Sequence, residues 1–366
     1  MSIKFKKLNF KSKDSKMQKQ DIKNFSIKEL ENLFIEKNIP AFRAKQIFKW
    51  VYLKQSDSFY EMTDLSKLFR EEADSLFSNP RLEIIKNEKS KKDGSEKFLF
   101  QLHDKNLIES VLIPEKDHYT LCISSQVGCA QNCKFCMTAK GGLKRNLSTS
   151  EIVSQIRDIQ NILEKGEHTH KRISNIVFMG MGEPLDNYDN VLRSIRIITD
   201  QDFGLKISRR KVTISTSGIV PSIVKLGKDT NIALAVSLNA ATDNLRSKLM
   251  PINKRFPLES LLNACKDYPM AKREKITFEY ILMKGINDSD QDALKIASLL
   301  RSIKAKINLI PFNPHPKSEF KRPSKKRIEQ FGKILLEKGY TVIVRWSKGD
   351  DINAACGQLR AIHEDQ

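Results

Sequence analysis

The sequence has no long apolar segment and no export signal. No run of 18 apolar residues occurs among its 366 residues, so no membrane-spanning helix and no membrane partner are expected. The basic and polar N-terminus lacks the apolar stretch that follows the charges of a secretory signal. We therefore expect a cytoplasmic protein that begins with a disordered basic tail over residues 1–20.

Cysteine is scarce, and acidic residues are fewer than basic residues. The six cysteines of a chain without an export signal are expected to stay reduced, where cysteine clusters more often bind metals or react than form structural disulfides. Lys and Arg number 64 against 44 Asp and Glu, which gives a net charge of +20. This excess favours a polyanionic partner, most simply RNA or DNA, although a generally basic proteome would produce the same balance.

Short apolar runs alternate with helical patterns from residue 119 onward. The runs are rich in β-branched and aromatic residues, as is typical of parallel strands that are buried on both faces. They lie at 119–125, 175–180, 211–217, 231–239, 276–283, 306–312 and 340–346. The helical pattern at 148–166 has Ser148 or Ser150 as its expected cap. At least six strand–helix units predict a parallel α/β fold, either a doubly wound sheet or a TIM-type barrel.

Residues 21–80 have a different pattern, with three amphipathic helices expected at 26–38, 41–55 and 65–77. The second of these is expected to bury Phe42, Ile47, Phe48, Trp50 and Val51. Its basic side chains should point outward, either into solvent or toward RNA: Arg43, Lys45, Lys49 and Lys54. Two strands, at 96–102 and 107–115, are expected to join this small helical module to the barrel.

Four of the six cysteines lie between residues 122 and 136, and three of these have the spacing C-x3-C-x2-C: Cys129, Cys133 and Cys136. A structural zinc site usually needs four ligands, and the closest histidine, His118, precedes the triplet. Three thiolates on one loop suit a 4Fe–4S cluster whose fourth iron stays open to S-adenosylmethionine. This spacing after the first strand of the repeat resembles the signature of the radical S-adenosylmethionine superfamily.

The segment MGMGEP, residues 179–184, resembles the glycine–glutamate motif of that superfamily. Since glycine lets a backbone approach a ligand closely, the edge of Gly182 and Glu183 is expected to bind the methionine amino group. By position, the resemblance assigns the remaining cofactor contacts to Ser215, Ser237, Leu238, Asn239 and Asn313. The superfamily more often has histidine in place of Asn239, and the serines could instead be helix caps or turn formers.

Several longer segments narrow the resemblance to one family. They are LCISSQVGCAQNCKFC, GGLKRNLS, GMGEPLDNYDNV, TISTSGIVP, LIPFNP, GDDINAACGQL and, in the helical module, AFRAKQIFKWVY. Together they resemble the dual-specificity methyltransferases that modify carbon 2 of adenine in 23S ribosomal RNA and transfer RNA. The resemblance covers roughly residues 25–360.

This resemblance implies a partial (β/α)6 TIM-type barrel with a small N-terminal helical accessory domain. The expected division is a tail at 1–20, an RNA-binding accessory domain with linking strands at 21–98, a strand extension at 99–118, the core barrel at 119–350 and a C-terminal loop at 351–366. It also implies one 4Fe–4S cluster, two S-adenosylmethionine molecules per turnover, a flavodoxin-like electron donor and a monomer.

A radical route suits this reaction because carbon 2 of adenine is electron-poor and does not attack a methyl group. The resemblance implies that the thiolate of Cys356 first accepts a methyl group, which a radical then activates for addition to adenine. Glu109 would remove the ring proton, and Cys122 would attack the sulfur of Cys356 to form a transient disulfide and release the base. Cys265, in an amphipathic helix, is expected to be buried and inert.

Several alternatives stay open. Lys144 and Arg145 are expected to contact phosphates or to belong to a solvated loop. A sister family methylates carbon 8 of the same ribosomal adenine with the same residues. A non-catalytic iron–sulfur or zinc RNA-binding protein would not need Cys122 or Cys356. A sulfur-inserting radical enzyme would usually carry three more clustered cysteines, which this chain lacks.

Overall fold

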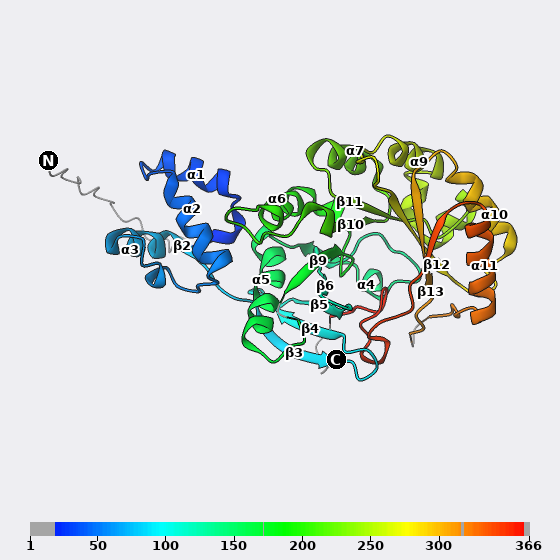
Figure 1. The fold of residues 1–366 in the computed structure, drawn as a ribbon, viewed down its shortest axis with the longest axis horizontal. Helices are drawn as coiled ribbons and strands as arrows, with labels where there is room; N and C mark the ends of the chain where they lie inside the picture. Colours follow the sequence, from blue (N-terminus) through cyan, green and yellow to red (C-terminus); the bar gives the residue numbers. More distant parts are fainter. Residues whose placement is uncertain (1–18, 171, 316–317, 362–366) are drawn as a thin grey trace.

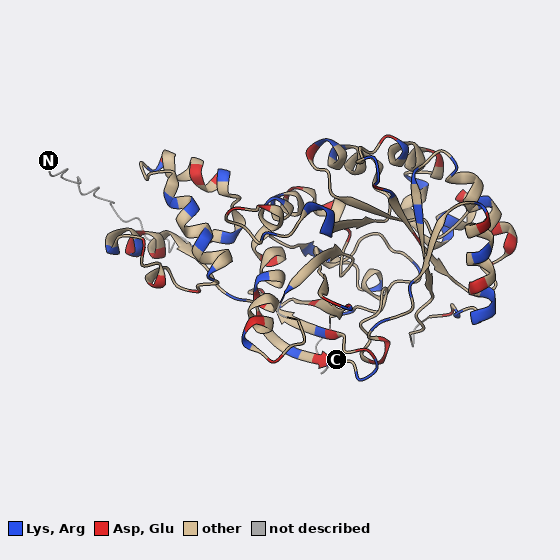
Figure 2. Cartoon of the chain, in the orientation of Figure 1, with Lys and Arg blue, Asp and Glu red and all other residues tan. Residues whose placement is uncertain are grey.

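The computed structural model describes residues 19–170, 172–315 and 318–361 (Figure 1). Residues 1–18 of the predicted tail and residues 362–366 of the predicted C-terminal loop lie outside this range. Figure 1 shows a small helical part beside a larger part that is built around a curved sheet. Lys and Arg residues occur on both parts, as Figure 2 shows, so the basic residues are not confined to one region.

The three predicted accessory helices are present: α1 (Ile27–Glu36), α2 (Phe42–Phe48) and α3 (Lys67–Leu76). A π-helical turn, Lys49–Leu53, continues α2, and the short strands β1 (Gln20–Asp21) and β2 (Phe77–Ser78) pair in parallel. Ile47, Phe48 and Val51 are buried as expected, whereas Trp50 is half-buried.

The prediction that Phe42 belongs to this core is wrong, because its side chain is 55% exposed. The buried positions of the second helix recur every three or four residues from Ala44, and Phe42 lies outside this stripe. Lys45, Lys49 and Lys54 are exposed as predicted, while Arg43 is partly covered and stacks over Phe42 at 4.9 Å.

Seven parallel strands form the main part of a ten-stranded sheet within the described chain. They are β6 (Tyr119–Cys122), β9 (Ile173–Phe178), β10 (Val212–Thr216), β11 (Ala233–Ser237), β12 (Ile276–Leu282), β13 (Ala305–Pro311) and β14 (Thr341–Val344). Each neighbours the next in chain order, so every crossover advances in the same direction. This order is that of a barrel, since a doubly wound sheet reverses direction midway. The predicted partial TIM-type barrel is confirmed.

Helices follow these strands and cover the outer side of the sheet (Figure 1). They are α5 (Thr149–Lys165), α6 (Tyr188–Thr199), α7 (Val220–Asp229), α8 (Asp243–Leu249), α9 (Leu258–Lys266), α10 (Asp290–Leu299) and α11 (Lys325–Glu337). Ser148, not Ser150, caps α5, because it forms a capping box with Glu151.

Three antiparallel strands extend the sheet beyond β6: β5 (Leu107–Pro114), β4 (Glu96–Gln101) and β3 (Glu83–Lys89). The two predicted linking strands are thus part of the barrel sheet, and β3 was not predicted. The expected boundary between residues 98 and 99 falls inside β4. No helix in the described ranges is long and apolar enough to cross a membrane.

A buried arginine joins the accessory helices to the barrel. Arg157 of α5 is completely covered, and it donates from Nε to the Val51 carbonyl at 3.0 Å. Its Nη2 donates to the Ser56 carbonyl and to Asp57 Oδ1, both at 2.7 Å. Since a buried cation is tolerated only when its donors are satisfied, these bonds require the two parts to stay docked.

Candidate active site

The cysteine loop is held between the strands of a short antiparallel ribbon, β7 (Gln126–Gly128) and β8 (Leu143–Asn146). Gly128 has a φ of +76°, and a Cβ there would lie 1.8 Å from the Gly142 carbonyl oxygen, so only glycine fits. The backbone of Cys129 donates to that same oxygen at 2.9 Å. The loop ends where α4 (Met137–Lys140) begins, directly after Cys136.

The three predicted cluster ligands, Cys129, Cys133 and Cys136, line one cavity. Burial raises the pKa of Cys129 to about 12 and raises that of Cys133, and the charge of Cys136 adds to both shifts. Thiolates this crowded need a positive partner, which a bound metal supplies. No three Cys, His, Asp or Glu side chains in the described chain converge on a single ion. A 4Fe–4S cluster does not require its ligands to converge on a single ion, because each thiolate binds a separate iron.

The cavity encloses about 880 Å³, including space that is open to solvent, beyond the carboxyl ends of the central parallel strands. This is the face on which barrel enzymes place their chemistry. Besides the cysteine triplet, it contains many of the residues that the sequence singled out: Gly182, Glu183, Ser215, Ser237, Asn239 and Cys356. Leu238, Asn313, Cys122 and Glu109 are not among its lining residues.

Both oxygens of the Glu183 carboxylate already accept hydrogen bonds from the protein backbone. They accept hydrogen bonds from the backbone of Ser217 at 2.7 Å and of Leu185 at 3.1 Å. Burial raises its pKa, and these hydrogen bonds oppose the shift. Gly182, with a φ of +99°, packs so closely on Gln126 that a Cβ would lie 2.5 Å from the Gln126 Cβ. A ligand therefore meets the backbone of this turn more readily than the Glu183 side chain.

Ser215 donates from its hydroxyl to Glu279 Oε2 at 3.0 Å. Glu279 lies on β12, lines the cavity and is buried. Its pKa is raised by burial, while Arg345 lowers it. Sequence reasoning missed Glu279, although a carboxylate inside the apolar strand run ITFEYIL was a signal for it.

The end of β11 and the segment after it place Ser237 and Asn239 at the cavity and bury Leu238 beside it. Asn239 has a φ of +55°, a left-handed conformation that asparagine tolerates better than most residues. Its Oδ1 accepts from the backbone of Ile281 at 2.8 Å, and its Nδ2 lies 3.3 Å from the sulfur of Met250. The Asn239 amide thus holds neighbouring strand ends together.

The C-terminal loop brings Cys356 to the cavity, and Asn313 helps to hold it there. Asn313 donates from Nδ2 to the carbonyl of Cys356 at 3.0 Å. On the other side, the backbone of Met137 donates to the Gly357 carbonyl at 2.8 Å. The Cys356 side chain is accessible through the cavity. The surrounding protein raises the pKa of the Cys356 thiol, and the nearby Arg345 lowers it.

Cys122 is buried at the end of β6 and is not part of a disulfide. Burial raises its pKa, and the charge of Cys356 raises it further, so the two thiols lie near each other. Cys122 pairs across the sheet with Val111, and Glu109 is two residues along the same strand. Because paired residues and alternate residues share a face, Glu109 and Cys122 lie on the same side of the sheet.

Glu109 is buried, with Oε1 3.5 Å from Lys97 Nζ. Its Oε2 has no hydrogen-bond partner in the described chain. Burial raises the Glu109 pKa, against the opposing effects of Lys97 and the backbone of Arg360, four residues after Cys356. Cys265, by contrast, is completely buried in α9 among apolar side chains, as expected.

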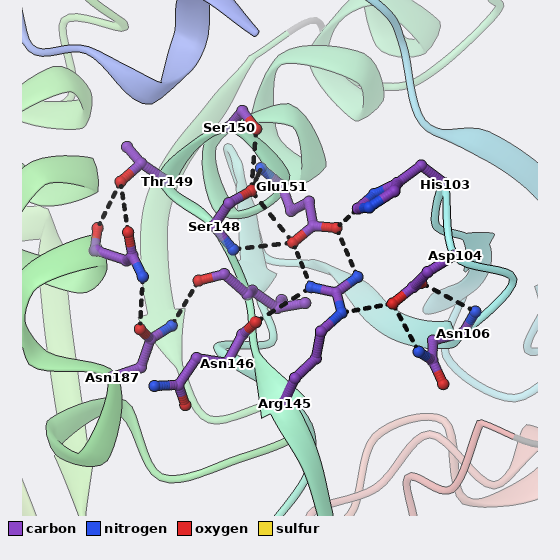
Figure 3. A network of polar contacts seen from close by, with 12 residues as sticks. His103, Asp104, Asn106, Arg145, Asn146, Ser148, Thr149, Ser150, Glu151 and Asn187 are labelled. Atoms are coloured by element: carbon purple, nitrogen blue, oxygen red, sulfur yellow. Dashed lines mark hydrogen bonds and ion pairs between the residues drawn. The ribbon is translucent and has the colours of Figure 1, made fainter. Parts of the chain in front are cut away.

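The guanidinium of Arg145 is bound by two carboxylates of the protein itself, and the phosphate contact suggested for it stays a prediction. Figure 3 shows its guanidinium between Glu151 at the start of α5 and Asp104 in the β4–β5 turn. The nitrogen–oxygen distances are 2.8 Å and 2.6 Å respectively. Arg145 therefore ties three elements together, and it holds the pKa of Asp104 well below its usual range. Lys144 is exposed.

Comparison with known proteins matches two parts of the chain to family models. Residues 123–297 match the radical SAM superfamily, and residues 20–77 match the ribosomal RNA large subunit methyltransferase N-terminal domain. A crystal structure of a radical SAM methyltransferase from Sphaerobacter thermophilus has 40% sequence identity and a TM-score of 0.86. That match covers 94% of this chain and all of the other.

Two relatives are similar over nearly their whole length, and both are named dual-specificity RNA methyltransferase RlmN. The protein from Desulfosudis oleivorans is 53% identical, over 93% of this chain and 91% of its own. The protein from Geotalea uraniireducens is 49% identical, over 94% of this chain and 97% of its own. With this identity along both the accessory domain and the barrel, the chain belongs to the RlmN family of radical SAM dual-specificity RNA methyltransferases.

Proposed function

We propose that this protein methylates carbon 2 of adenosine in 23S ribosomal RNA and in transfer RNA. In this proposal, Cys129, Cys133 and Cys136 hold one 4Fe–4S cluster, and two S-adenosylmethionine molecules are used per turnover. When bound, these groups supply the methyl group and the one-electron chemistry that an electron-poor ring carbon requires. The supporting observation is that an accessible thiol, Cys356, shares one cavity with the cysteine triplet, while a second thiol is buried nearby.

Cys356 is suited to accept the methyl group because its thiol is accessible and Arg345 opposes the rise in its pKa that burial causes. Asn313 and the start of α4 hold the backbone on both sides of this thiol, and thereby orient it toward the cavity. Cys122 is buried, so it is unsuited to the first methyl transfer. The two thiols can thus take different roles in one reaction.

Glu109 is suited to remove the proton from the adenine ring once the methyl carbon is bonded to carbon 2. Its pKa is raised by burial, and one of its oxygens has no hydrogen-bond partner in the described chain. A base of raised pKa is more effective near neutral pH than an ordinary carboxylate.

Cys122 would then release the product. Its thiolate attacks the sulfur of Cys356, so that an S–S bond forms and the bond from that sulfur to the methyl carbon breaks. The electron pair of the broken bond stays with the carbon, which gains a proton to complete the methyl group. Cellular thiols reduce the disulfide, which fits the reducing cytoplasm that we propose as the setting. We also propose a flavodoxin-like electron donor and a monomer.

Nucleoside mass spectrometry after an anaerobic reaction tests this proposal. The reconstituted protein receives reductant, methyl-deuterated S-adenosylmethionine, and either a 23S ribosomal RNA fragment or an anticodon stem-loop. We expect labelled 2-methyladenosine in both RNAs, none with Cys356→Ala, and near-normal amounts with Cys265→Ala as the matched cysteine control. Labelled 8-methyladenosine would show that the carbon-8 alternative is correct, and an active Cys356→Ala variant would contradict the methyl-acceptor role.

A further inference from the structure

A second hollow adjoins the active-site cavity, at the turn between β4 and β5. It encloses about 810 Å³, including space that is open to solvent. Its walls come from that turn, from the ribbon around the cysteine loop and from the chain that follows Cys356. The lining residues used below are Lys105, Gly128, Thr138, Gly142, Lys144 and Arg360.

The hollow carries positive charge that its own walls do not neutralise. Lys105, Lys144 and Arg360 line it, and no Asp or Glu is among its described lining residues. Among the residues that the structure describes, the Lys105 Nζ donates only to a neutral group, Gln101 Oε1, at 3.1 Å. The carboxylates nearest in the chain to Lys105 and Lys144, those of Asp104 and Glu151, are already bound to Arg145, as Figure 3 shows.

The hollow shares part of its wall with the active-site cavity. Thr138 lines both, and its hydroxyl donates to the Leu359 carbonyl at 2.7 Å. Leu359 lines the active-site cavity, and the next residue, Arg360, lines the hollow. A chain molecule with one unit beside Cys356 therefore has a positively charged hollow close by for its neighbouring unit.

Two glycines leave the backbone without side chains at the wall of this hollow. Gly128 and Gly142, with φ values of +76° and +67°, meet at its wall. A Cβ on Gly142 would meet no atom within 4 Å, so a side chain at that position would project into open space.

We propose that this hollow binds a phosphate group of the RNA substrate, next to the adenosine that enters the active site. The inference rests on the proposed function, because it takes RNA as the substrate. A base that is modified must leave its stack, and the flanking phosphates then fix the position of the strand. Lysine and arginine supply the charge for such contacts, and the phosphate is read without regard to sequence.

Neutralising the two lysines tests this proposal. The variant Lys105→Gln/Lys144→Gln keeps side chains of similar shape, and Lys295→Gln/Lys326→Gln removes the same charge from exposed positions on α10 and α11. Binding of a fluorescent anticodon stem-loop and of a 23S ribosomal RNA hairpin is measured by anisotropy at several salt concentrations. Melting temperature and S-adenosylmethionine affinity show that the fold and the cofactor site are intact.

We expect Lys105→Gln/Lys144→Gln to bind both RNAs about tenfold more weakly than the control variant Lys295→Gln/Lys326→Gln at low salt. The slope of log affinity against log salt should fall by about 0.7–0.9 for each phosphate contact that is lost. Equal affinities and slopes for the two variants would overturn the phosphate site, even if the wild-type protein methylates RNA. If the wild-type protein binds neither RNA, the proposed function fails with it.

Discussion

At the scale of single residues, two charged groups act in opposite directions on the Cys356 thiol. The negative charge of Glu279 raises the Cys356 pKa, and the positive charge of Arg345 lowers it. Ser215 holds Glu279 in place through a hydrogen bond of 3.0 Å. The Cys356 pKa, which burial raises, is therefore also adjusted by Glu279 on β12 and by Arg345, which directly follows β14.

Removing either charge should shift the pH dependence of Cys356 alkylation. We expect Glu279→Gln to move the midpoint of iodoacetamide labelling to lower pH, because a neighbouring negative charge is lost. Arg345→Met should move the midpoint to higher pH, because the charge that stabilises the thiolate is lost. The labelling rate of Cys356 in the reconstituted protein is measured by peptide mass spectrometry from pH 6 to pH 10. Two shifts in the same direction would contradict this account.

Cys122→Ala should stop the release of product. Without the second thiol, nothing attacks the Cys356 sulfur, so the RNA should stay bonded to the protein through the methyl carbon. We expect a protein band of higher mass on a denaturing gel that collapses after ribonuclease treatment, and a loss of free methylated RNA of at least about a hundredfold. Cys265→Ala should give no such band. Turnover at the normal rate by Cys122→Ala would rule out a resolving role for this thiol.

At the scale of elements, the β4–β5 turn, β8 and the start of α5 are joined by one arginine. Arg145 bonds Asp104 and Glu151, and Glu151 also caps α5 through Ser148 (Figure 3). The same turn carries Lys105, which lines the basic hollow. The ion pairs of Arg145 thus hold the position of a proposed RNA contact.

This pairing predicts a pH-dependent contribution to stability. Arg145 lowers the pKa of Asp104, so the native state binds fewer protons there than the unfolded chain, whose pKa is near 3.8. The stabilisation is present above that value and is lost as the pH falls toward the lower native pKa. We expect Asp104→Asn to reduce the free energy of unfolding by about 0.5–1 kcal/mol at pH 7, since the pair is partly exposed.

The measurement is urea unfolding of the wild-type protein and Asp104→Asn at pH 7, 5 and 3. The difference between them should shrink at pH 3, because Asp104 of the unfolded chain gains a proton below its pKa of about 3.8, while native Asp104 stays ionised. Asp189→Asn is a suitable control, because Asp189 pairs with Lys225 at 3.4 Å and both side chains are more than half exposed. A difference that grew toward low pH would contradict the assigned sign.

At the scale of the whole molecule, the accessory helices and the barrel are held together by buried polar bonds as well as apolar contacts. Arg157 reaches across this boundary to Val51, Ser56 and Asp57. Arg193 also crosses it, with Nε 2.8 Å from Glu29, but this pair is partly exposed to solvent. The two arginines form a matched comparison of buried and exposed contacts.

Arg157→Met should loosen the accessory domain far more than Arg193→Met. Loss of the buried cation removes its bonds to the Val51 and Ser56 carbonyls and to Asp57, at a cost of about 3–5 kcal/mol. Loss of the exposed pair should cost less than about 1 kcal/mol. Calorimetry should show a separate unfolding transition of the accessory domain, at lower temperature than that of the barrel, in Arg157→Met only. A single unchanged transition would show that apolar packing alone holds the two parts together.

Local patterns were enough to predict most of the elements and the cysteine loop. The seven parallel strands were found from their apolar runs, α5 from its capping serine, and the cysteine loop from C-x3-C-x2-C, because each signal depends on residues that are close in the chain. The same locality explains the error at Phe42, since an apolar residue at a helix end can lie outside the buried stripe.

Only the tertiary structure decided which distant groups meet. The nearness of Cys356 to Cys122 depends on the docking of the C-terminal loop against Asn313 and α4, and the shared face of Glu109 and Cys122 depends on strand register. Contacts of this kind follow from the closure of the sheet and from packing between remote segments, which no short pattern encodes. The use of Arg145 as a structural tie, and the basic hollow beside it, were visible for the same reason only in three dimensions.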